Sequence, residues 1–152
     1  MDSSQLSSFA RKRVLITGAS SGVGRATAFK FLNSGAKVAL VGRDIQSLNE
    51  IGQQFPLQAI AIQCDLGVDL QQYDMSKVVI EKLGGLDILV NAAGVIFDGD
   101  IENTFPQDFD YIVDINVRCP FHLINLFLPF LKRSKGAIVN ISATVSFYFP
   151  YL

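Results

Sequence analysis

The chain has 152 residues, of which 49% are hydrophobic and 18% are charged, and its formal net charge at pH 7 is −1. This length predicts one domain with enough apolar side chains for a core. The basic residues are scattered apart from two short clusters, so the sequence lacks the basic stripe that nucleic-acid binding requires. No apolar run approaches the roughly 18 residues of a membrane span, and we expect a soluble protein without a nucleic-acid or membrane partner.

Cys64 and Cys119 are the only cysteines, and they lie far apart, without the spacing of redox or zinc motifs. We therefore expect two free thiols, a reducing compartment and no metal site. Residues 1–12 lack the apolar segment of a secretory signal and are predicted to form a flexible N-terminal extension. A cytoplasmic location is expected, with the mitochondrial matrix as the less favoured alternative because the extension contains serine and arginine.

From residue 13 onward, short β-branched runs alternate with helical segments, which is typical of a parallel sheet covered by helices on both faces. The predicted strands cover residues 14–17, 37–41, 58–63, 87–91 and 137–141. The predicted helices cover residues 24–33, 45–55, 70–83 and 107–132. Small or flexible residues at 33–35, at Gly52 and at 84–85 are expected to end helices.

A turn of small residues follows the first predicted strand. From Thr17 to Gly24 the sequence reads TGASSGVG, and a helix is predicted to begin at its end. Such a turn lets the backbone approach a phosphate, while the helix N-terminus and the serine hydroxyls offer hydrogen-bond donors. An ordinary tight turn is the structural alternative. The strand, turn and helix context favours a dinucleotide pyrophosphate site made by Gly18, Ser20, Ser21, Gly22, Val23 and Gly24.

The pattern TGxxxGxG resembles that of the short-chain dehydrogenase/reductase family, and four further matches follow in the family's order. They are Asp65-Leu66, the NAAG run from Asn91 to Gly94, Asn116 within the longest predicted helix, and the apolar run 136–142. Together the matches span residues 12–143. The resemblance implies an α/β fold for residues 13–152: a three-layer, Rossmann-type, doubly wound parallel sheet with strand order 3-2-1-4-5.

The resemblance also implies roles for several of these residues. Asp65 and Leu66 would contact the adenine, and Asn91, Ala92 and Gly94 would lie beside the adenine ribose. Asn116 corresponds to the family's active-site asparagine. For Asp65, a purely structural role at the end of a strand is the alternative.

The cofactor preference is predicted from the end of the second strand, where an acidic residue would bind the NAD ribose and repel a 2′-phosphate. This sequence has Gly42 and Arg43 at that point. Gly42 leaves room, and a guanidinium can pair with a phosphate through two hydrogen bonds. NADP(H) is therefore favoured over NAD(H), and the alternative is that Arg43 pairs with its neighbour Asp44 on the surface.

The family's chemistry uses a serine after the fifth strand and a tyrosine followed four residues later by a lysine. Here Ala143 holds the expected serine position, with Ser142 beside it, and the expected tyrosine position falls beyond Leu152. Tyr148 and Tyr151 are too early in the sequence. Since family members are longer than this chain, the C-terminal strands and helices of the fold are expected to be missing.

Two functional classes remain open. The chain either derives from an NADP(H)-dependent oxidoreductase for a small carbonyl or alcohol substrate, or is a catalytically inactive nucleotide-binding or dimerisation module. The helix predicted over 107–132 is apolar on more than one face, and the resemblance implies that it forms a dimer contact, so a homo-oligomer is expected. The single histidine, His122, lies on this helix and is assigned to packing.

Overall fold

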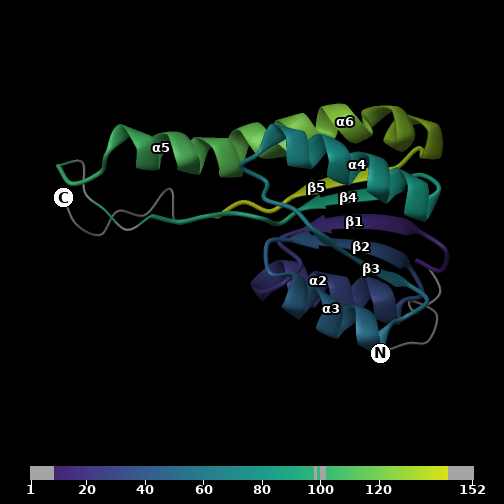
Figure 1. The fold of residues 1–152 in the computed structure, drawn as a ribbon. Helices are drawn as coiled ribbons and strands as arrows, with labels where there is room; N and C mark the ends of the chain where they lie inside the picture. The colour runs from purple at the N-terminus through teal and green to yellow at the C-terminus, as the bar shows by residue number, and fades with distance from the viewer. Residues whose placement is uncertain (1–8, 98, 100–101, 144–152) are drawn as a thin grey trace.

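The computed structural model describes residues 9–97, 99 and 102–143, and its described part is built around one parallel sheet (Figure 1). The strands lie in the order β3-β2-β1-β4-β5. The predicted three-layer fold and strand order are therefore confirmed. The strands are β1 (Arg13–Thr17), β2 (Lys37–Gly42), β3 (Ala59–Gln63), β4 (Ile88–Asn91) and β5 (Ala137–Asn140).

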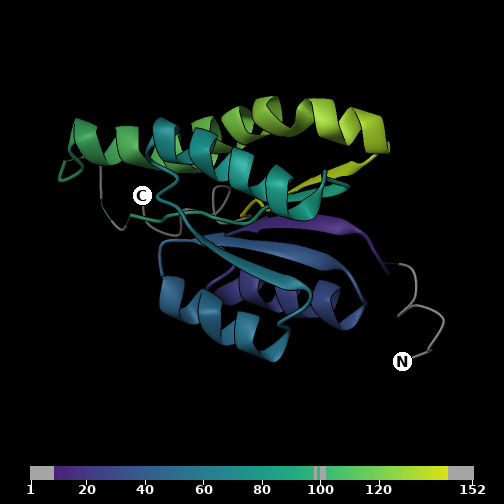
Figure 2. The same cartoon turned by 45° about the vertical axis from the view of Figure 1, so that its right-hand side comes forward.

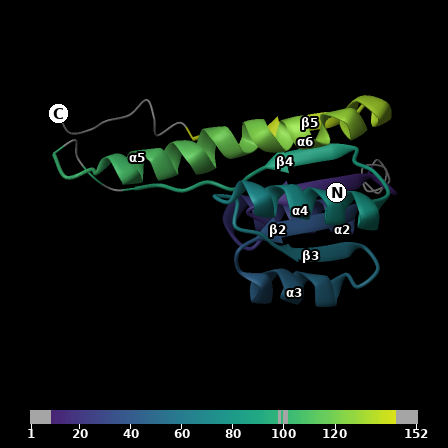
Figure 3. The same cartoon turned by 45° about the horizontal axis from the view of Figure 1, so that its top comes forward.

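Helices cover both faces of the sheet, as Figures 1 and 2 show. One face carries α2 (Gly22–Asn33) and α3 (Ile45–Gln54), and the other carries α4 (Asp69–Leu83) and α6 (Cys119–Ser134). The helix α5 (Pro106–Val113) extends past the end of the sheet (Figure 3). Across the described residues, no helix has both the length and the apolar character required to cross a membrane.

The core consists of two apolar layers, one on each face of the sheet. In β1, Val14 and Ile16 pack with α2 and α3, whereas Leu15 packs with α4 and α6. This alternation follows from the pleat, which sends successive side chains to opposite faces. Because both faces of the central strands are covered, these strands need apolar side chains at nearly every position. This explains the continuous apolar runs in the sequence.

The ends of the predicted strands and helices agree with the structure to within two residues. Gly84 ends α4 in the left-handed conformation, with φ at 73°, as predicted. The expectation that Gly52 ends a helix was wrong, because Gly52 lies inside α3, whose last residue is Gln54. Burial of Leu48 and Ile51 against the sheet stabilises this helix despite the cost of a glycine, which is about 1 kcal/mol.

The helix predicted over 107–132 is continuous but not uniform. Between α5 and α6 lies the π-helical segment η1 (Asp114–Arg118), in which the Cys119 N–H donates to the Asp114 carbonyl five residues earlier. A π-helical turn inserted into a longer helix is often found at a functional site. Asn116, the predicted active-site residue, lies within this segment.

An ion pair joins the starts of two strands at the amino end of the sheet. Arg13 donates through Nε and Nη2 to the Asp87 carboxylate at 2.8 and 3.0 Å, and through Nη1 to the Gly84 carbonyl at 2.9 Å. Hydrogen bonding from Arg13 lowers the pKa of Asp87. The pair joins the turn between α4 and β4 to the start of β1 and therefore has a structural role.

The N-terminal segment contacts α2 where it is described. The Phe9 ring packs edge-on against Phe31, with 5.0 Å between ring centroids. Residues 1–8 of the predicted extension lie outside the described residues, as do Tyr148 and Tyr151.

Candidate functional site

A cleft of about 370 Å³ lies at the carboxyl end of the sheet, where the loops after all five strands meet. Parallel α/β sheets bind their ligands at this end. Among the predicted site residues, those that line the cleft are Gly18, Ser20, Ser21, Gly22, Val23, Gly24, Arg43, Asp65, Leu66, Ala92 and Gly94. Asn91 and Asn116 are outside this lining set. The structure therefore brings eleven of the thirteen predicted residues to one cleft.

Two glycines in the turn after β1 are required by close backbone packing. Gly18 has a φ of +65°, and a Cβ on it would lie 2.8 Å from the Ala93 Cα. A Cβ on Gly24 would meet the carbonyl group of Gly18, at 2.7 Å from the carbonyl carbon. The first turn of α2 and the loop after β4 thus both pack closely against Gly18. These contacts position the backbone at the floor of the cleft.

The N-terminus of α2 opens into the cleft. Gly22, Val23 and Gly24 form its first turn and line the cleft, and the Ser21 side chain makes no capping hydrogen bond to them. The N–H groups of a first helical turn have no partners within the helix, and together with the helix dipole they favour an anionic group. This end of the cleft is therefore suited to a pyrophosphate.

Hydrogen bonds fix the loop after β4 from two sides. The Thr17 hydroxyl oxygen accepts from the N–H groups of Ala92 and Ala93, each at 3.1 Å. From the other side, the Asn116 amide accepts from the Val95 N–H and donates to the Val95 carbonyl, both at 2.9 Å. Asn116 thus fastens the end of this loop to η1. Thr17 thus holds this loop in place, a role that its place in the sequence did not indicate.

Asn91 contacts the neighbouring strand. It is buried, and its Nδ2 donates to Asn140 Oδ1 at 2.8 Å, in register across β4 and β5. Its own Oδ1 has no hydrogen-bond partner among the described residues. Asn91 therefore joins two strands at the point where the cleft begins.

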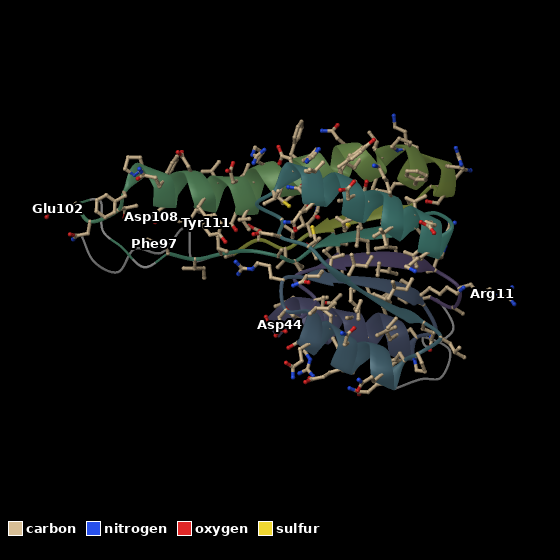
Figure 4. The ribbon with its side chains drawn as sticks, in the orientation of Figure 1. Arg11, Asp44, Phe97, Glu102, Asp108 and Tyr111 are labelled. Atoms are coloured by element: carbon tan, nitrogen blue, oxygen red, sulfur yellow. The ribbon has the colours of Figure 1, made fainter. Side chains whose placement is uncertain are left out.

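Arg43 and Asp44 have separate partners. Arg43 donates through Nη1 to the Tyr111 hydroxyl at 3.2 Å. The Asp44 carboxylate accepts from the Ser47 hydroxyl at 2.6 Å and from the Ser47 N–H at 3.1 Å, which caps α3 and lowers the pKa of Asp44. The alternative interpretation of Arg43, a surface ion pair with Asp44, is not what the structure shows. In Figure 4, Tyr111 lies along the helix that extends to the left, and Asp44 lies below and to the right of it, both on the side away from Arg11.

The turn after β3 is held by a chain of hydrogen bonds. Asp65 Oδ1 accepts from the Gly67 N–H at 3.0 Å, and the Leu66 carbonyl accepts from Nε2 of the buried Gln72 at 2.7 Å. His122 Nδ1 lies 2.9 Å from Gln72 Oε1, so this histidine is bonded between helices. The Asp65 carboxylate has a structural role in the turn and also lines the cleft.

The two cysteines are buried free thiols. Burial raises the pKa of Cys64 to about 11 and that of Cys119 to about 12, so both stay protonated near neutral pH. Cys64 lines the cleft without being a nucleophile. Over the described residues, no three histidine, cysteine, aspartate or glutamate side chains are grouped as a metal site would need.

The tyrosine and lysine that the family's chemistry needs are not found at the cleft in the described residues. Tyr73 and Lys77 have the four-residue spacing, but they lie on α4, where Lys77 Nζ sits 4.0 Å from the centre of the Tyr73 ring. Neither residue lines the cleft. Ser142 and Ala143 follow β5 and are exposed.

Some residues of the cleft were not predicted as part of it. Tyr111 and Ile115 come from α5 and η1, Ile141 directly follows β5, and Ala93 belongs to the loop after β4. Tyr111 and Ile115 are four residues apart, so they share one face of the helix. The signal in the sequence was that Ile115 directly precedes the predicted site residue Asn116 and that Tyr111 lies four residues before Ile115.

The chain belongs to the short-chain dehydrogenase family. The family model described as "short chain dehydrogenase" matches residues 12–150. An uncharacterised oxidoreductase from Staphylococcus epidermidis is 39% identical over 137 residues, which cover 90% of this chain and 60% of the relative. A 3-dehydrosphinganine reductase from Arabidopsis thaliana is 30% identical over 125 residues, covering 82% and 38% of the two chains.

Solved structures agree with this assignment. A metagenomic short-chain oxidoreductase in complex with NADP is 32% identical, with a TM-score of 0.84 over 90% of this chain and 64% of that chain. A short-chain dehydrogenase from Streptomyces avermitilis is also 32% identical, with a TM-score of 0.83 over 87% and 49% of the two chains. The chain spans about 60% of the length of the Staphylococcus relative.

Proposed function

We propose that this chain provides the nucleotide site of an NADP(H)-dependent oxidoreductase that acts on a small carbonyl or alcohol substrate. The observation that carries the proposal is the convergence of the glycine turn, Arg43 and the Asp65-Leu66 turn on one cleft. Two relatives support it. One similar structure is described as a complex with NADP, and one similar protein is named a reductase.

The cleft suggests an orientation for the nucleotide. The pyrophosphate would lie over the first turn of α2, with the adenine beside Asp65 and Leu66 and its ribose beside Ala92 and Gly94. Arg43 would then meet the 2′-phosphate. When bound, the nicotinamide supplies hydride exchange with a substrate carbon.

Asn116 is proposed as an active-site residue in the complete site. Its side chain holds the Val95 backbone through two hydrogen bonds, so its first effect is to keep the loop after β4 in place. The π-helical turn around it widens the helix at that point.

Arg43→Ala is expected to weaken NADPH binding about tenfold to a hundredfold, because a charge-assisted pair with the 2′-phosphate is lost. NADH lacks that phosphate, so its affinity should change far less. Fluorescence titration of both nucleotides measures the effect. Arg133→Ala is the matched control, since it removes the same charge at the amino end of the sheet, beside Gly84 and Arg13. Unchanged NADPH affinity in the Arg43 variant would refute the proposed phosphate contact.

The alternative function is an inactive nucleotide-binding or dimerisation module, and Ala143 at the expected serine position favours it. We expect that the 152-residue chain oxidises NADPH no faster than a protein-free control in the presence of carbonyl substrates, because Ala143 has no hydroxyl and, among the described residues, no tyrosine–lysine pair lines the cleft. Spectrophotometry at 340 nm, about where reduced nicotinamides absorb, follows the reaction. Substrate-dependent oxidation clearly above the control would rule the alternative out.

We further propose that the chain self-associates through the helical stretch 107–132. Large apolar side chains are exposed on it, namely Phe109, Val117 and Phe121, and the exposed Phe105 lies just before it. Phe105 and Phe109 are four residues apart, as are Val117 and Phe121, so each pair lies along one side of its own helical segment. An exposed apolar stripe of this kind favours burial against a second copy.

A further inference from the structure

We propose that Tyr111 is a positioning residue that holds the Arg43 guanidinium at the mouth of the cleft and thereby increases the preference for a 2′-phosphorylated nucleotide. The inference rests on the proposed function of the cleft, and it assigns a role to a residue outside the glycine turn and the loops that follow the strands. Tyr111 and Arg43 are 68 positions apart in the sequence, and both line the cleft.

Tyr111 reaches the cleft from a helix and not from a loop that follows a strand. It belongs to α5, which has no buried residue of its own and extends past the sheet (Figures 3 and 4). A Cβ on Gly67 would lie 3.9 Å from Tyr111 Cε2 and 3.5 Å from Ile115 Cδ1, so both side chains lie along the turn after β3. The phenol ring therefore bridges that turn and the end of β2.

Arg43 is held at both ends. Its carbonyl accepts a hydrogen bond from Gln63 Nε2 at 3.0 Å, which fixes the backbone beside β3. Its Nη1 donates to the Tyr111 hydroxyl at 3.2 Å, which fixes the guanidinium. An exposed arginine otherwise samples many rotamers and loses that freedom when it binds a ligand. Holding it in advance favours binding by reducing this loss.

The partner of Arg43 leaves its charge available. A tyrosine hydroxyl is neutral, whereas pairing with Asp44 would neutralise the guanidinium, and the Asp44 carboxylate is bonded to Ser47 instead. A guanidinium has five N–H donors, so one bond to Tyr111 leaves others for phosphate oxygens. The arrangement is suited to a dianionic group at this point of the cleft.

Tyr111→Phe is the variant that tests this role, because it removes the hydroxyl and keeps the ring. We expect the ratio of NADPH to NADH affinity to fall about three- to tenfold, which corresponds to one lost hydrogen bond. Tyr73→Phe is the matched control, since Tyr73 is an exposed tyrosine on α4 that does not line the cleft. It should leave the ratio unchanged.

A double variant tests whether Tyr111 acts through Arg43. With Arg43→Ala already present, Tyr111→Phe should have no further effect on the ratio. An equal further loss in the double variant, an equal weakening of both nucleotides, or a ratio unchanged by Tyr111→Phe would each overturn the inference. The proposed function fails separately, and that failure is visible in Arg43→Ala alone as an unchanged NADPH affinity.

Discussion

Gly24→Ala is expected to weaken NADPH binding by about a hundredfold or more and to lower the free energy of unfolding by about 1–3 kcal/mol. Alanine inside a helix normally stabilises it relative to glycine, by about 0.5–1 kcal/mol. The opposite sign is expected here because the new Cβ would meet the Gly18 carbonyl, a backbone group.

Gly18 cannot move away easily. Its own Cα faces the backbone of Ala92 and Ala93, which Thr17 holds by two hydrogen bonds. The strain is therefore relieved by a shift of the first turn of α2, and that shift moves the N–H groups proposed to bind the pyrophosphate. Loss of affinity and loss of stability thus have one physical cause.

Urea unfolding and nucleotide titration on the same variant measure both effects. Gly52→Ala is the matched control, because Gly52 is also inside a helix and a Cβ there meets nothing within 4 Å. It should raise the unfolding free energy by about 0.5–1 kcal/mol and leave nucleotide binding intact. If Gly24→Ala bound NADPH like the unsubstituted chain, the proposed pyrophosphate site would be wrong.

Much of the fold could be predicted from the sequence because its signals are local. Short apolar runs predicted the strands, and the parallel arrangement follows from their alternation with helices. The glycine turn could be predicted equally well, since its strand, turn and helix are contiguous in the chain. Strand order came from the family resemblance, which the structure confirms.

Contacts between residues that are far apart in the chain could not be predicted from the sequence in the same way. Arg43 was predicted to pair either with a phosphate or with adjacent Asp44, and its observed partner is Tyr111 on α5. The Gln72 bond to the Leu66 carbonyl also depends on how α4 meets the end of β3. Such contacts follow from the three-dimensional arrangement, which sequence spacing alone does not specify.

The stretch 107–132 shows a related difficulty, since its apolar residues occur on more than one face. The sequence indicated that these faces are apolar but did not indicate which one packs on the sheet. In the structure Leu123, Phe127 and Leu131 are buried at intervals of four residues, while Phe121 is 68% exposed. The π-helical turn of η1 shifts the register between α5 and α6, so a uniform helical period would misplace the faces.

Phe127→Ala is expected to lower the free energy of unfolding by about 3–5 kcal/mol, because the ring is fully buried between α6 and the sheet. That is a large part of the roughly 5–15 kcal/mol by which a domain is stable. Phe121→Ala, at the same residue type on the exposed side of α6, should change the unfolding free energy little in dilute solution.

The dependence of the unfolding midpoint on protein concentration distinguishes the exposed face of α6 from its buried face. If the chain self-associates through Phe121, the unfolding midpoint of the unsubstituted chain rises with protein concentration, because association stabilises the folded state. Phe121→Ala should remove that dependence, whereas Phe127→Ala should lower the midpoint at every concentration. Equal losses from both substitutions in dilute solution would mean that the two rings are buried alike, and the exposed side of α6 would then be no candidate for a contact with a second copy.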